Sequence, residues 1–216
     1  MKKILVIGGN GFLGKNLKKV FLDTEYEMFY ESRVTNLDLT DYDSTLHKIN
    51  QIKPDIIINA AANVGSVHYV NTYAADVIDV NSRMILNLYS TVSKSNPNII
   101  IINPIANCTY PSRVHLQKED EWWDGPLHQS VESYATTRKL GFTISECYKR
   151  QYGVKTINLI MPNAYGVFDH TDPEKTHAMN GIIIRMIESQ KNGDSEFVVW
   201  GSGKPIREWI YMEDMA

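Results

Sequence analysis

Short, wholly apolar runs alternate along the chain with longer segments in which apolar residues recur every third or fourth position. Continuous runs are typical of strands covered on both faces, and the recurring pattern is typical of helices with one buried side. We predict strands over 2–8, 26–30, 56–58, 99–102 and 156–161, and helices over 12–21, 41–49, 76–93 and 131–152. This alternation predicts an α/β fold, a doubly wound parallel (Rossmann) sheet whose ligand site lies at the carboxyl ends of the strands.

The pattern changes after Gly166. A polar stretch leads to a predicted helix over 178–188, a predicted strand over 197–200 and a Gly-x-Gly-x-Pro loop. We therefore expect a dinucleotide-binding domain over 1–166, a partial substrate-binding lobe over 167–205, and a return segment toward the first domain over 206–216. Asp214 is a plausible helix N-cap with no helix after it, so we expect a truncated chain.

The first predicted strand ends in a glycine-rich turn. Gly8, Gly11 and Gly14 have the spacing G-x-x-G-x-x-G, and Phe12 and Leu13 begin the following helix. The first glycine allows a tight turn, the second lets backbone N–H groups approach a pyrophosphate, and the third lets the helix pack on the strand. Because the motif lies in a strand–turn–helix context, it predicts dinucleotide binding at the helix N-terminus.

The end of the second predicted strand bears on the choice of nucleotide. Glu31 would accept a hydrogen bond from the ribose 2′-OH of NAD, whereas Ser32 and Arg33 would hold the 2′-phosphate of NADP. The alternative is that all three are solvated turn residues. We predict NADP, with NAD left open. The other predicted cofactor contacts are Asp38, Ala60, Ala61 and Ala62.

Composition narrows the class of protein. The 216 residues include 22 Lys and Arg against 25 Asp and Glu, a formal net charge of −3, and 43% are hydrophobic. This composition supports a packed core and offers no basic patch for nucleic acid. Cys108 and Cys147 lie far apart without metal-ligand spacing, so we expect no metal site and a reducing, cytoplasmic location. No apolar run approaches the ~20 residues of a membrane span, so no membrane association is expected.

Further motifs extend the pattern along the chain. They are AANVG at 61–65, NCTYP at 107–111, ExYxRQYG at 146–153, PNAYG at 162–166, TH at 176–177 and VWGSGKPIRE at 199–208. With these motifs, nearly the whole chain resembles the extended short-chain dehydrogenase/reductases, the NAD-dependent epimerase/dehydratase family. Cys-x-Tyr-Pro with the downstream His is specific to the GDP-L-fucose synthase branch, which acts on GDP-4-keto-6-deoxymannose. Members carry additional substrate-lobe sequence beyond the point where this chain ends.

The resemblance implies an epimerisation step that uses Cys108 and His177. A proton must leave one face of the carbon next to the ketone and return on the other, which requires an acid and a base. A thiol and an imidazole have ordinary pKa values of ~8.5 and ~6.5, close enough to neutrality for this exchange. The alternative interpretations are a buried inert cysteine and a loop histidine. The presence of both residues in matching surroundings favours the acid–base pair.

The resemblance also implies a reduction step, in which a tyrosine gives a proton while the nicotinamide gives a hydride. Tyr134 is present, but Arg138 stands where the family has lysine, and Ala106 stands where it has a serine or threonine. Arg138 retains the positive charge that is expected to lower the pKa of Tyr134, and it can still donate to ribose hydroxyls, although a guanidinium is not interchangeable with an ammonium. Lys139 points to a different face of the helix and is not expected to substitute. The epimerase half is therefore intact, and the reductase half departs from the family pattern.

Three residues are candidate substrate contacts. Asn163 follows a strand end, and Arg185 and Arg207 suit a nucleotide diphosphate; turn formation and surface charge are the alternatives. The resemblance also implies a homodimer, in which the apolar stripe of the helix over 76–93 and part of the Tyr134 helix form the helical contact common in this family. Ordinary core packing explains the stripe equally well. Together these features predict an NAD(P)-dependent epimerase/reductase for a nucleotide sugar, GDP-linked by resemblance. The alternative is a catalytically silent dinucleotide-binding module.

Overall fold

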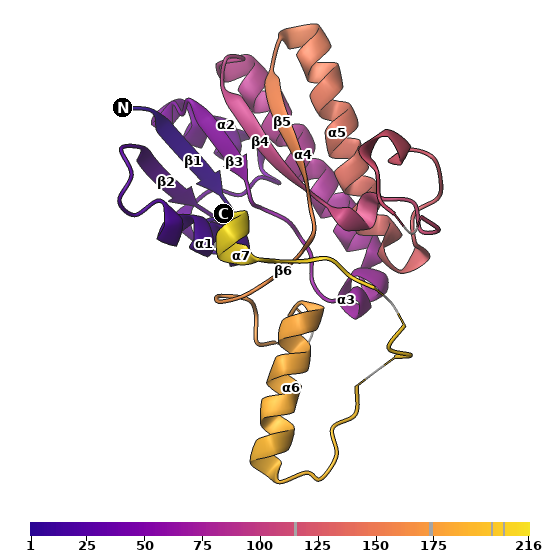
Figure 1. The fold of residues 1–216 in the computed structure, drawn as a ribbon. Coiled ribbons are helices and arrows are strands. Elements are labelled where there is room, and N and C mark those ends of the chain that lie inside the picture. The colour runs from indigo at the N-terminus through magenta and orange to yellow at the C-terminus, as the bar shows by residue number, and fades with distance from the viewer. Residues whose placement is uncertain (115, 173–174, 200, 205) are drawn as a thin grey trace.

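A computed structural model of the chain describes residues 1–114, 116–172, 175–199, 201–204 and 206–216. Its centre is a parallel sheet with the strand order β2-β1-β3-β4-β5 (Figure 1). The strands are β1 (Lys3–Ile7), β2 (Glu27–Glu31), β3 (Ile56–Asn59), β4 (Ile100–Ala106) and β5 (Lys155–Met161). The predicted α/β fold with a parallel Rossmann sheet is confirmed.

Helices cover both faces of this sheet. They are α1 (Phe12–Val20), α2 (Tyr42–Ile52), α3 (Val67–Thr72), α4 (Ala74–Ser95) and α5 (Glu132–Tyr152). Leu5 and Ile7 of β1 pack in one core cluster with residues of α2, α4 and α5, whereas Ile4 and Val6 pack with Leu17 of α1 on the other face. Successive residues of β1 thus point to opposite faces, and both faces of this strand are buried, which explains its continuous apolar run. The edge strand β5 differs, because Ile157 and Leu159 are 49% and 40% exposed.

The chain order of the strands fixes the position of the candidate site. From β1 the chain crosses to β2 on one side and then returns past β1 to β3 on the other. This reversal leaves a topological switch point between β1 and β3, where ligands bind in open α/β sheets. The turn after Ile7 and the segment after Asn59 both begin at this edge.

The chain after β5 forms a second, smaller sheet and a projecting helix, and its last residues pack against α1. β6 (Asn163–Tyr165) and β7 (Trp209–Tyr211) form a two-stranded parallel sheet, and α6 (Ala178–Asn192) extends away from the main sheet without a buried residue (Figure 1). The short α7 (Met212–Met215) returns to α1, where Glu213 pairs with Lys19 at 2.5 Å. Short 3-10 helices complete the described structure: η1 (Arg33–Thr35), η2 (Asn107–Thr109), η3 (Glu119–Glu121) and η4 (Gln129–Val131).

Two predictions for this part of the chain are wrong. Residues 197–199 form no strand, because Val198 and Val199 are 68% and 55% exposed and pair with no described strand; Trp200, like Pro205 of the predicted loop, lies outside the described residues. Asp214 does not cap a helix, since α7 begins two residues earlier at Met212 and Asp214 lies within it. No helix among the described residues is long and apolar enough to cross a membrane.

Candidate active site

The glycine turn, residues 8–14, is packed so closely that larger residues do not fit. Gly8 has a φ of +87°, and a Cβ there would lie 2.7 Å from backbone atoms of Ala60 and Ala61. A Cβ on Gly14 would lie 2.3 Å from the carbonyl oxygen of Gly8. The backbone N–H groups of Gly8 and Gly9 donate to the carbonyl of Glu31, at 2.8 and 3.0 Å. The turn therefore joins the carboxyl ends of β1, β2 and β3, and brings the predicted Ala60–Ala62 segment against the glycines.

The same turn fits the phosphates of a dinucleotide. Gly11 is the N-cap of α1 and is extended, and no side chain caps the helix there. The first N–H groups of a helix are donors without intrahelical acceptors, and the helix dipole favours an anion beside them. A close-packed glycine cradle in front of an uncapped helix is the arrangement that lets a pyrophosphate approach the backbone. Of the first two residues of the helix, Leu13 packs with Ile4 and Val6 of β1, and Phe12 packs with Ala164 and Met212.

The end of β2 combines an acidic and a basic side chain. Lys48 of α2 lies 3.4 Å from one carboxylate oxygen of Glu31, while the other oxygen is buried without a hydrogen-bond partner among the described residues. Ser32 accepts a hydrogen bond from the amide of Asn10 at 2.8 Å, and Arg33 is exposed in η1. Glu31 is thus held by a cation, and Arg33 leaves its charge toward solvent.

Asp38, another predicted cofactor contact, has a local structural role. Its carboxylate oxygen Oδ1 accepts from the backbone N and the hydroxyl of Thr40, at 2.9 and 2.7 Å. Its carbonyl accepts from the hydroxyl of Thr45 at 3.3 Å. These bonds shape the entrance to α2, and a cofactor contact by Asp38 stays a prediction.

Cys108, Tyr134 and Arg138 lie together between η2 and α5. The guanidinium carbon of Arg138 is 4.9 Å from the centre of the Tyr134 ring, and the side chain is only 3% exposed. Its Nη2 donates to Oδ1 of Asn81 at 2.8 Å, and its buried Nε has no partner among the described residues. Asn81 in turn donates to the carbonyls of Val77 and Asn63. Sequence reasoning missed Asn81, which fixes the arginine from α4.

Burial decides the protonation of this cluster. Burial raises the pKa of Cys108 to about 11, and the charge of Arg138 opposes the rise only in part. Burial likewise raises the pKa of Tyr134, again against the influence of Arg138. The arginine therefore does not lower the tyrosine pKa below its ordinary value in this structure. Both groups carry their protons at neutral pH and are placed to donate them.

A second buried cation braces the loop beside Cys108. Lys139 Nζ donates to the carbonyl of Trp122 at 2.6 Å and lies 4.6 Å from the centre of the Trp123 ring; burial lowers its pKa. Trp122 Nε1 donates to the hydroxyl of Thr109 at 2.8 Å, and that hydroxyl donates to the carbonyl of Ala106 at 2.7 Å. The ammonium of Lys139 is thus bound by the loop that carries Trp122 and Trp123, here called the tryptophan loop. It lies on a different side of α5 from Arg138.

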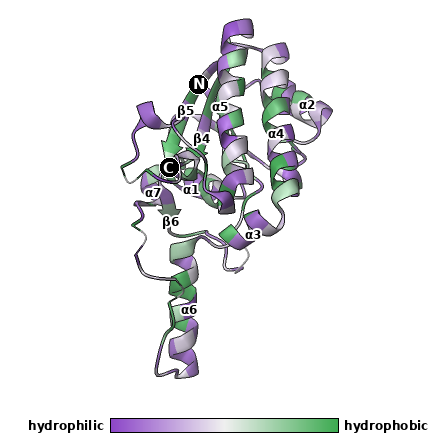
Figure 2. Cartoon of the chain, turned by 90° about the vertical axis from the view of Figure 1, so that its right-hand side faces the viewer, coloured by the Kyte–Doolittle hydropathy of each residue, from purple (hydrophilic) through white to green (hydrophobic). Residues whose placement is uncertain are grey.

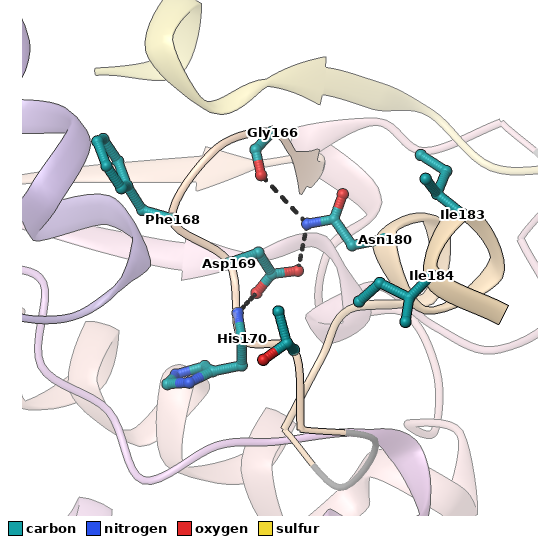
Figure 3. Close-up of a pocket in the computed structure, with 8 residues that line it drawn as sticks. Gly166, Phe168, Asp169, His170, Asn180, Ile183 and Ile184 are labelled. Atoms are coloured by element: carbon teal, nitrogen blue, oxygen red, sulfur yellow. Dashed lines mark hydrogen bonds between the residues drawn. The ribbon is translucent and has the colours of Figure 1, made fainter. Parts of the chain in front are cut away.

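His177, the N-cap residue of α6, is held by a buried carboxylate. Its Nδ1 lies 2.8 Å from Oδ1 of Asp169, and its backbone N donates to Oδ2 at 3.1 Å. Asn180 donates to the same Oδ2 at 2.6 Å and to the carbonyl of Gly166 at 3.3 Å (Figure 3). The backbone N of His170 donates to Oδ1 at 2.9 Å. The hydrogen bonds from His177 and Asn180 outweigh burial and lower the pKa of Asp169.

The structure thus forms two groups of candidate residues. Cys108, Tyr134 and Arg138 form one, and His177 forms the other with the ring of Phe12, 5.5 Å away at the start of α1. No described hydrogen bond, ion pair or ring contact joins His177 to Cys108. His177 nonetheless lies against the glycine turn, which places it at the cofactor end of the candidate site.

The predicted substrate contacts lie on the C-terminal part of the chain. The amide of Asn163 donates to the carbonyl of Glu208 at 3.1 Å and so joins the ends of β6 and β7. The guanidinium carbon of Arg185 lies 5.5 Å from the centre of the Phe197 ring, and Arg207 is exposed. Their predicted contacts with substrate remain predictions. Among the described residues, no cluster of His, Cys, Asp and Glu could hold a metal ion.

Comparison with known proteins identifies the family. The model of the NAD dependent epimerase/dehydratase family matches residues 4–216. The chain belongs to this family. A putative GDP-L-fucose synthase 2 of Arabidopsis thaliana is 31% identical over 216 residues, which are 99% of this chain and 65% of that protein. A crystal structure of a GDP-L-fucose synthetase from Naegleria fowleri bound to NADP has a TM-score of 0.87 and 24% identity, over 99% of this chain and 70% of that one.

Other members of the epimerase/dehydratase family give the same result. GDP-L-fucose synthase of Escherichia coli (strain K12) is 28% identical over 217 residues, which are 100% of this chain and 67% of that protein. The chain spans just under two thirds of the length of the Arabidopsis relatives that it matches. At 24% identity, the likeness to the solved structure shows only the fold. The family model and the relatives confirm the predicted membership of the epimerase/dehydratase family.

Asp169 and Lys139, like Asn81, have roles in this epimerase-family site that the sequence did not predict. Asp169 lies eight residues before His177, a spacing that belongs to no periodic element. Only the turn after β6 brings its carboxylate to the imidazole. Lys139 follows Arg138 directly, and its partner Trp122 comes from a loop with no regular pattern. The one available signal was a lysine on the apolar side of a helix, next to a pair of tryptophans.

Proposed function

We propose that this chain is the catalytic part of an NAD(P)-dependent epimerase/reductase that acts on a GDP-linked 4-keto sugar. The observation that carries the proposal is the combination of two proton-transfer groups with one cofactor turn. Cys108 lies with Tyr134 and Arg138 at the end of β4, and His177 lies against Phe12 of the glycine turn. The names of the curated relatives, which are GDP-L-fucose synthases, support a GDP-sugar substrate.

In this proposal the epimerisation belongs to Cys108 and His177. One group removes the proton from the carbon next to the ketone, and the other returns a proton to the opposite face, so the configuration of that carbon inverts. The thiol of Cys108 is protonated at neutral pH because burial raises its pKa to about 11. Asn163, Arg185 and Arg207 are proposed to hold the sugar and the nucleotide diphosphate.

The dinucleotide is proposed to lie on the glycine turn, with its phosphates at the N-terminus of α1. When bound, it supplies hydride for the reduction of the ketone. Tyr134 keeps its proton in this structure and would give it to the ketone oxygen. The buried Nε of Arg138, which has no hydrogen-bond partner among the described residues, would donate to a ribose hydroxyl. Ala106 offers no hydroxyl, so this chain has one ketone donor fewer than the family pattern provides.

We propose NADP rather than NAD as the cofactor. Lys48 neutralises Glu31, and this removes the acidic charge that would repel a 2′-phosphate. Ser32 and the exposed Arg33 are then free to contact that phosphate. The Naegleria fowleri structure bound to NADP agrees with this choice.

We further propose a homodimer in the cytoplasm. The outer faces of α4 and α5 lie side by side in Figure 2, and Ile78 and Leu86 of α4 are 39% and 47% exposed. A second copy of the chain would cover these apolar side chains. Both cysteines, Cys108 and Cys147, are free thiols, which agrees with a reducing compartment.

Solvent-deuterium incorporation tests the proposed function directly. The protein is incubated in D₂O with GDP-4-keto-6-deoxymannose, with and without NADPH, and the sugar is analysed by NMR and mass spectrometry. We expect deuterium at the carbons next to the ketone without NADPH, and slow reduction when NADPH is added. Absence of exchange with this and related keto sugars would contradict the proposal.

One observation favours a second candidate function, a dinucleotide-binding module without catalysis. Ala106 lacks the hydroxyl, and Arg138 replaces the ammonium, so the residues of the reductase step are altered while the glycine turn is complete. A module of this kind would bind NADPH and turn over no nucleotide sugar. The same incubation separates the two functions.

A further inference from the structure

The Asp169 carboxylate is saturated with hydrogen-bond donors. Oδ1 accepts from the backbone N of His170, and Oδ2 accepts from the backbone N of His177 and the amide of Asn180. Nδ1 of His177 lies 2.8 Å from Oδ1. The side chain of Asp169 is 2% exposed, whereas that of His177 is 39% exposed. Three N–H donors of fixed direction around one buried carboxylate favour its ionised form, and these contacts lower the pKa of Asp169.

We propose that Asp169 is the positioning residue for His177 and fixes the imidazole as the tautomer with its hydrogen on Nδ1, so that Nε2 transfers the proton. This inference rests on the proposed function, because it names the atom of His177 that exchanges the proton. It also states a property of the protein alone, the tautomer of His177, which is measurable without substrate.

The tautomer follows from the donor and acceptor inventory. An ionised carboxylate can only accept, so the ring nitrogen 2.8 Å from Oδ1 must carry hydrogen. In the neutral imidazole Nε2 is then the acceptor, and in the imidazolium both nitrogens are donors. The carboxylate stays in place in both states. It therefore lets Nε2 gain and lose a proton without rotation of the ring.

The rest of the surroundings restrict the ring without competing for Nε2. The ring of Phe12, from α1, packs against the imidazole, and the backbone N of His177 anchors the residue to the same carboxylate. His170 reaches Asp169 through its backbone N. None of the described hydrogen bonds involves Nε2. Nε2 is therefore the ring nitrogen left for substrate, on a side chain that is 39% exposed.

The first arm of the test is imidazole NMR on ¹⁵N-histidine-labelled protein. The signals of His177 are assigned by their loss in His177→Gln. We expect the neutral ring to have its hydrogen on Nδ1 in the unmodified protein, and Asp169→Ala to shift the population toward the Nε2–H form. Asp124→Asn, an exposed aspartate in a distant loop, is the matched control and should leave the signals unchanged. An Nε2–H tautomer in the unmodified protein would overturn the proposal.

The second arm is a double-mutant cycle on deuterium exchange. We expect Asp169→Ala to lower the exchange rate at least ~10²-fold in the unmodified background, the scale of a positioned acid–base group. In the His177→Gln background it should have no further effect, because the residue it positions is gone. Equal losses in both backgrounds would show a merely structural role and overturn the proposal. NADPH binding to the glycine turn reports that each variant is folded.

The two arms separate this proposal from the proposed function. If the unmodified protein exchanges deuterium into no keto sugar, the proposed function fails and proton transfer by Nε2 fails with it, while the NMR arm still decides the tautomer. If exchange is rapid but Asp169→Ala leaves both the rate and the tautomer unchanged, the proposed function stands and the role of Asp169 is wrong.

Discussion

Cys108 and His177 are held in contrasting ways. Ile105 and Tyr110, near Cys108 in the chain, form a buried cluster with Trp122, and Arg138 is the one charged side chain among the described residues that opposes the effect of burial on the pKa of the thiol. His177 has a carboxylate at hydrogen-bond distance and is partly open to solvent. Burial thus sets the protonation of Cys108, whereas a hydrogen bond to a carboxylate holds the ring of His177.

This difference shows how one chain can prepare two proton-transfer groups for different tasks. Burial disfavours the thiolate and keeps Cys108 protonated, while the carboxylate of Asp169 fixes the orientation of the His177 ring. The two devices also come from different parts of the chain. Cys108 depends on the tryptophan loop and α5, and His177 on the turn after β6 and on α6.

The largest effect is expected from Trp122→Ala. Trp122 is 3% exposed, packs on Phe142 and donates to Thr109, and its removal leaves a large cavity and frees Lys139. Truncation of a buried aromatic residue typically costs about 3–5 kcal/mol of unfolding free energy. Urea denaturation measures the loss. Trp123→Ala, at a 54% exposed neighbour, should cost much less. An unchanged urea midpoint for Trp122→Ala would show that the cluster of Ile105, Tyr110 and Trp122 does not stabilise the region around Cys108.

The second effect concerns reduction, which depends on the Cys108 side. If Ala106 and Arg138 limit hydride transfer, the paired substitution Ala106→Ser with Arg138→Lys should raise the reduction rate. Restoration of one ketone donor is typically worth about 10²–10³-fold. Single-turnover oxidation of NADPH measures it. Tyr134→Phe should abolish reduction and leave deuterium exchange intact. A protein that already reduces rapidly, and that the paired substitution slows, would show that arginine is an effective replacement.

The third effect is a pH-dependent loss of stability in Asp169→Asn. The fold lowers the pKa of Asp169, so its ionised form contributes stability above the unfolded pKa, and the contribution is lost as the pH falls through the lowered pKa. At pH 7 the variant should be less stable by about 1–3 kcal/mol, the cost of unsatisfied buried donors. The difference should shrink below about pH 4. Thermal unfolding across pH measures it, and a gap that widens with acid would contradict this account.

The smallest effect is expected from Arg33→Ala, which alters neither the surroundings of Cys108 nor those of His177. It should weaken NADPH binding about 10-fold, about 1.4 kcal/mol, and leave NADH binding nearly unchanged. Isothermal titration with both nucleotides measures the ratio. Equal losses, or tighter binding of NADH than of NADPH to the unmodified protein, would overturn the choice of NADP. His177 should keep its tautomer in this variant.

The sequence predicted the strands and helices of the main sheet, because the burial of their side chains imposes a periodic pattern of apolar residues on the sequence. Apolar strands and a G-x-x-G-x-x-G turn are compatible with few other folds. A Cβ on Gly14 would lie 2.3 Å from the carbonyl oxygen of Gly8, which explains why glycine is required there and why the motif can be recognised in the sequence. The C-terminal part was less predictable. β6 and β7 have three residues each, too few for a pattern, and the expected strand over 197–200 lacks a described partner.

The sequence predicted which residues belong to the candidate site, but it did not predict the hydrogen bonds that connect them. Cys108, Tyr134 and His177 were named from motifs, but hydrogen bonds between segments far apart in the chain decide their state. Asn81 lies 57 residues from Arg138, and nothing in the local sequence of either links them. The direction of the Tyr134 pKa likewise depends on burial in three dimensions, and the positive charge of Arg138 alone suggested the opposite sign.

The most direct test of the account is to measure inversion and exchange separately in Cys108→Ser and His177→Gln. Each protein is incubated in D₂O with GDP-4-keto-6-deoxymannose, and NMR reports both deuterium content and configuration at the carbons next to the ketone. A two-group mechanism predicts that the unmodified protein inverts the configuration and that each variant loses inversion at least ~10²-fold. Inversion at the unmodified rate in either variant would contradict the assignment of Cys108 and His177 as the acid–base pair.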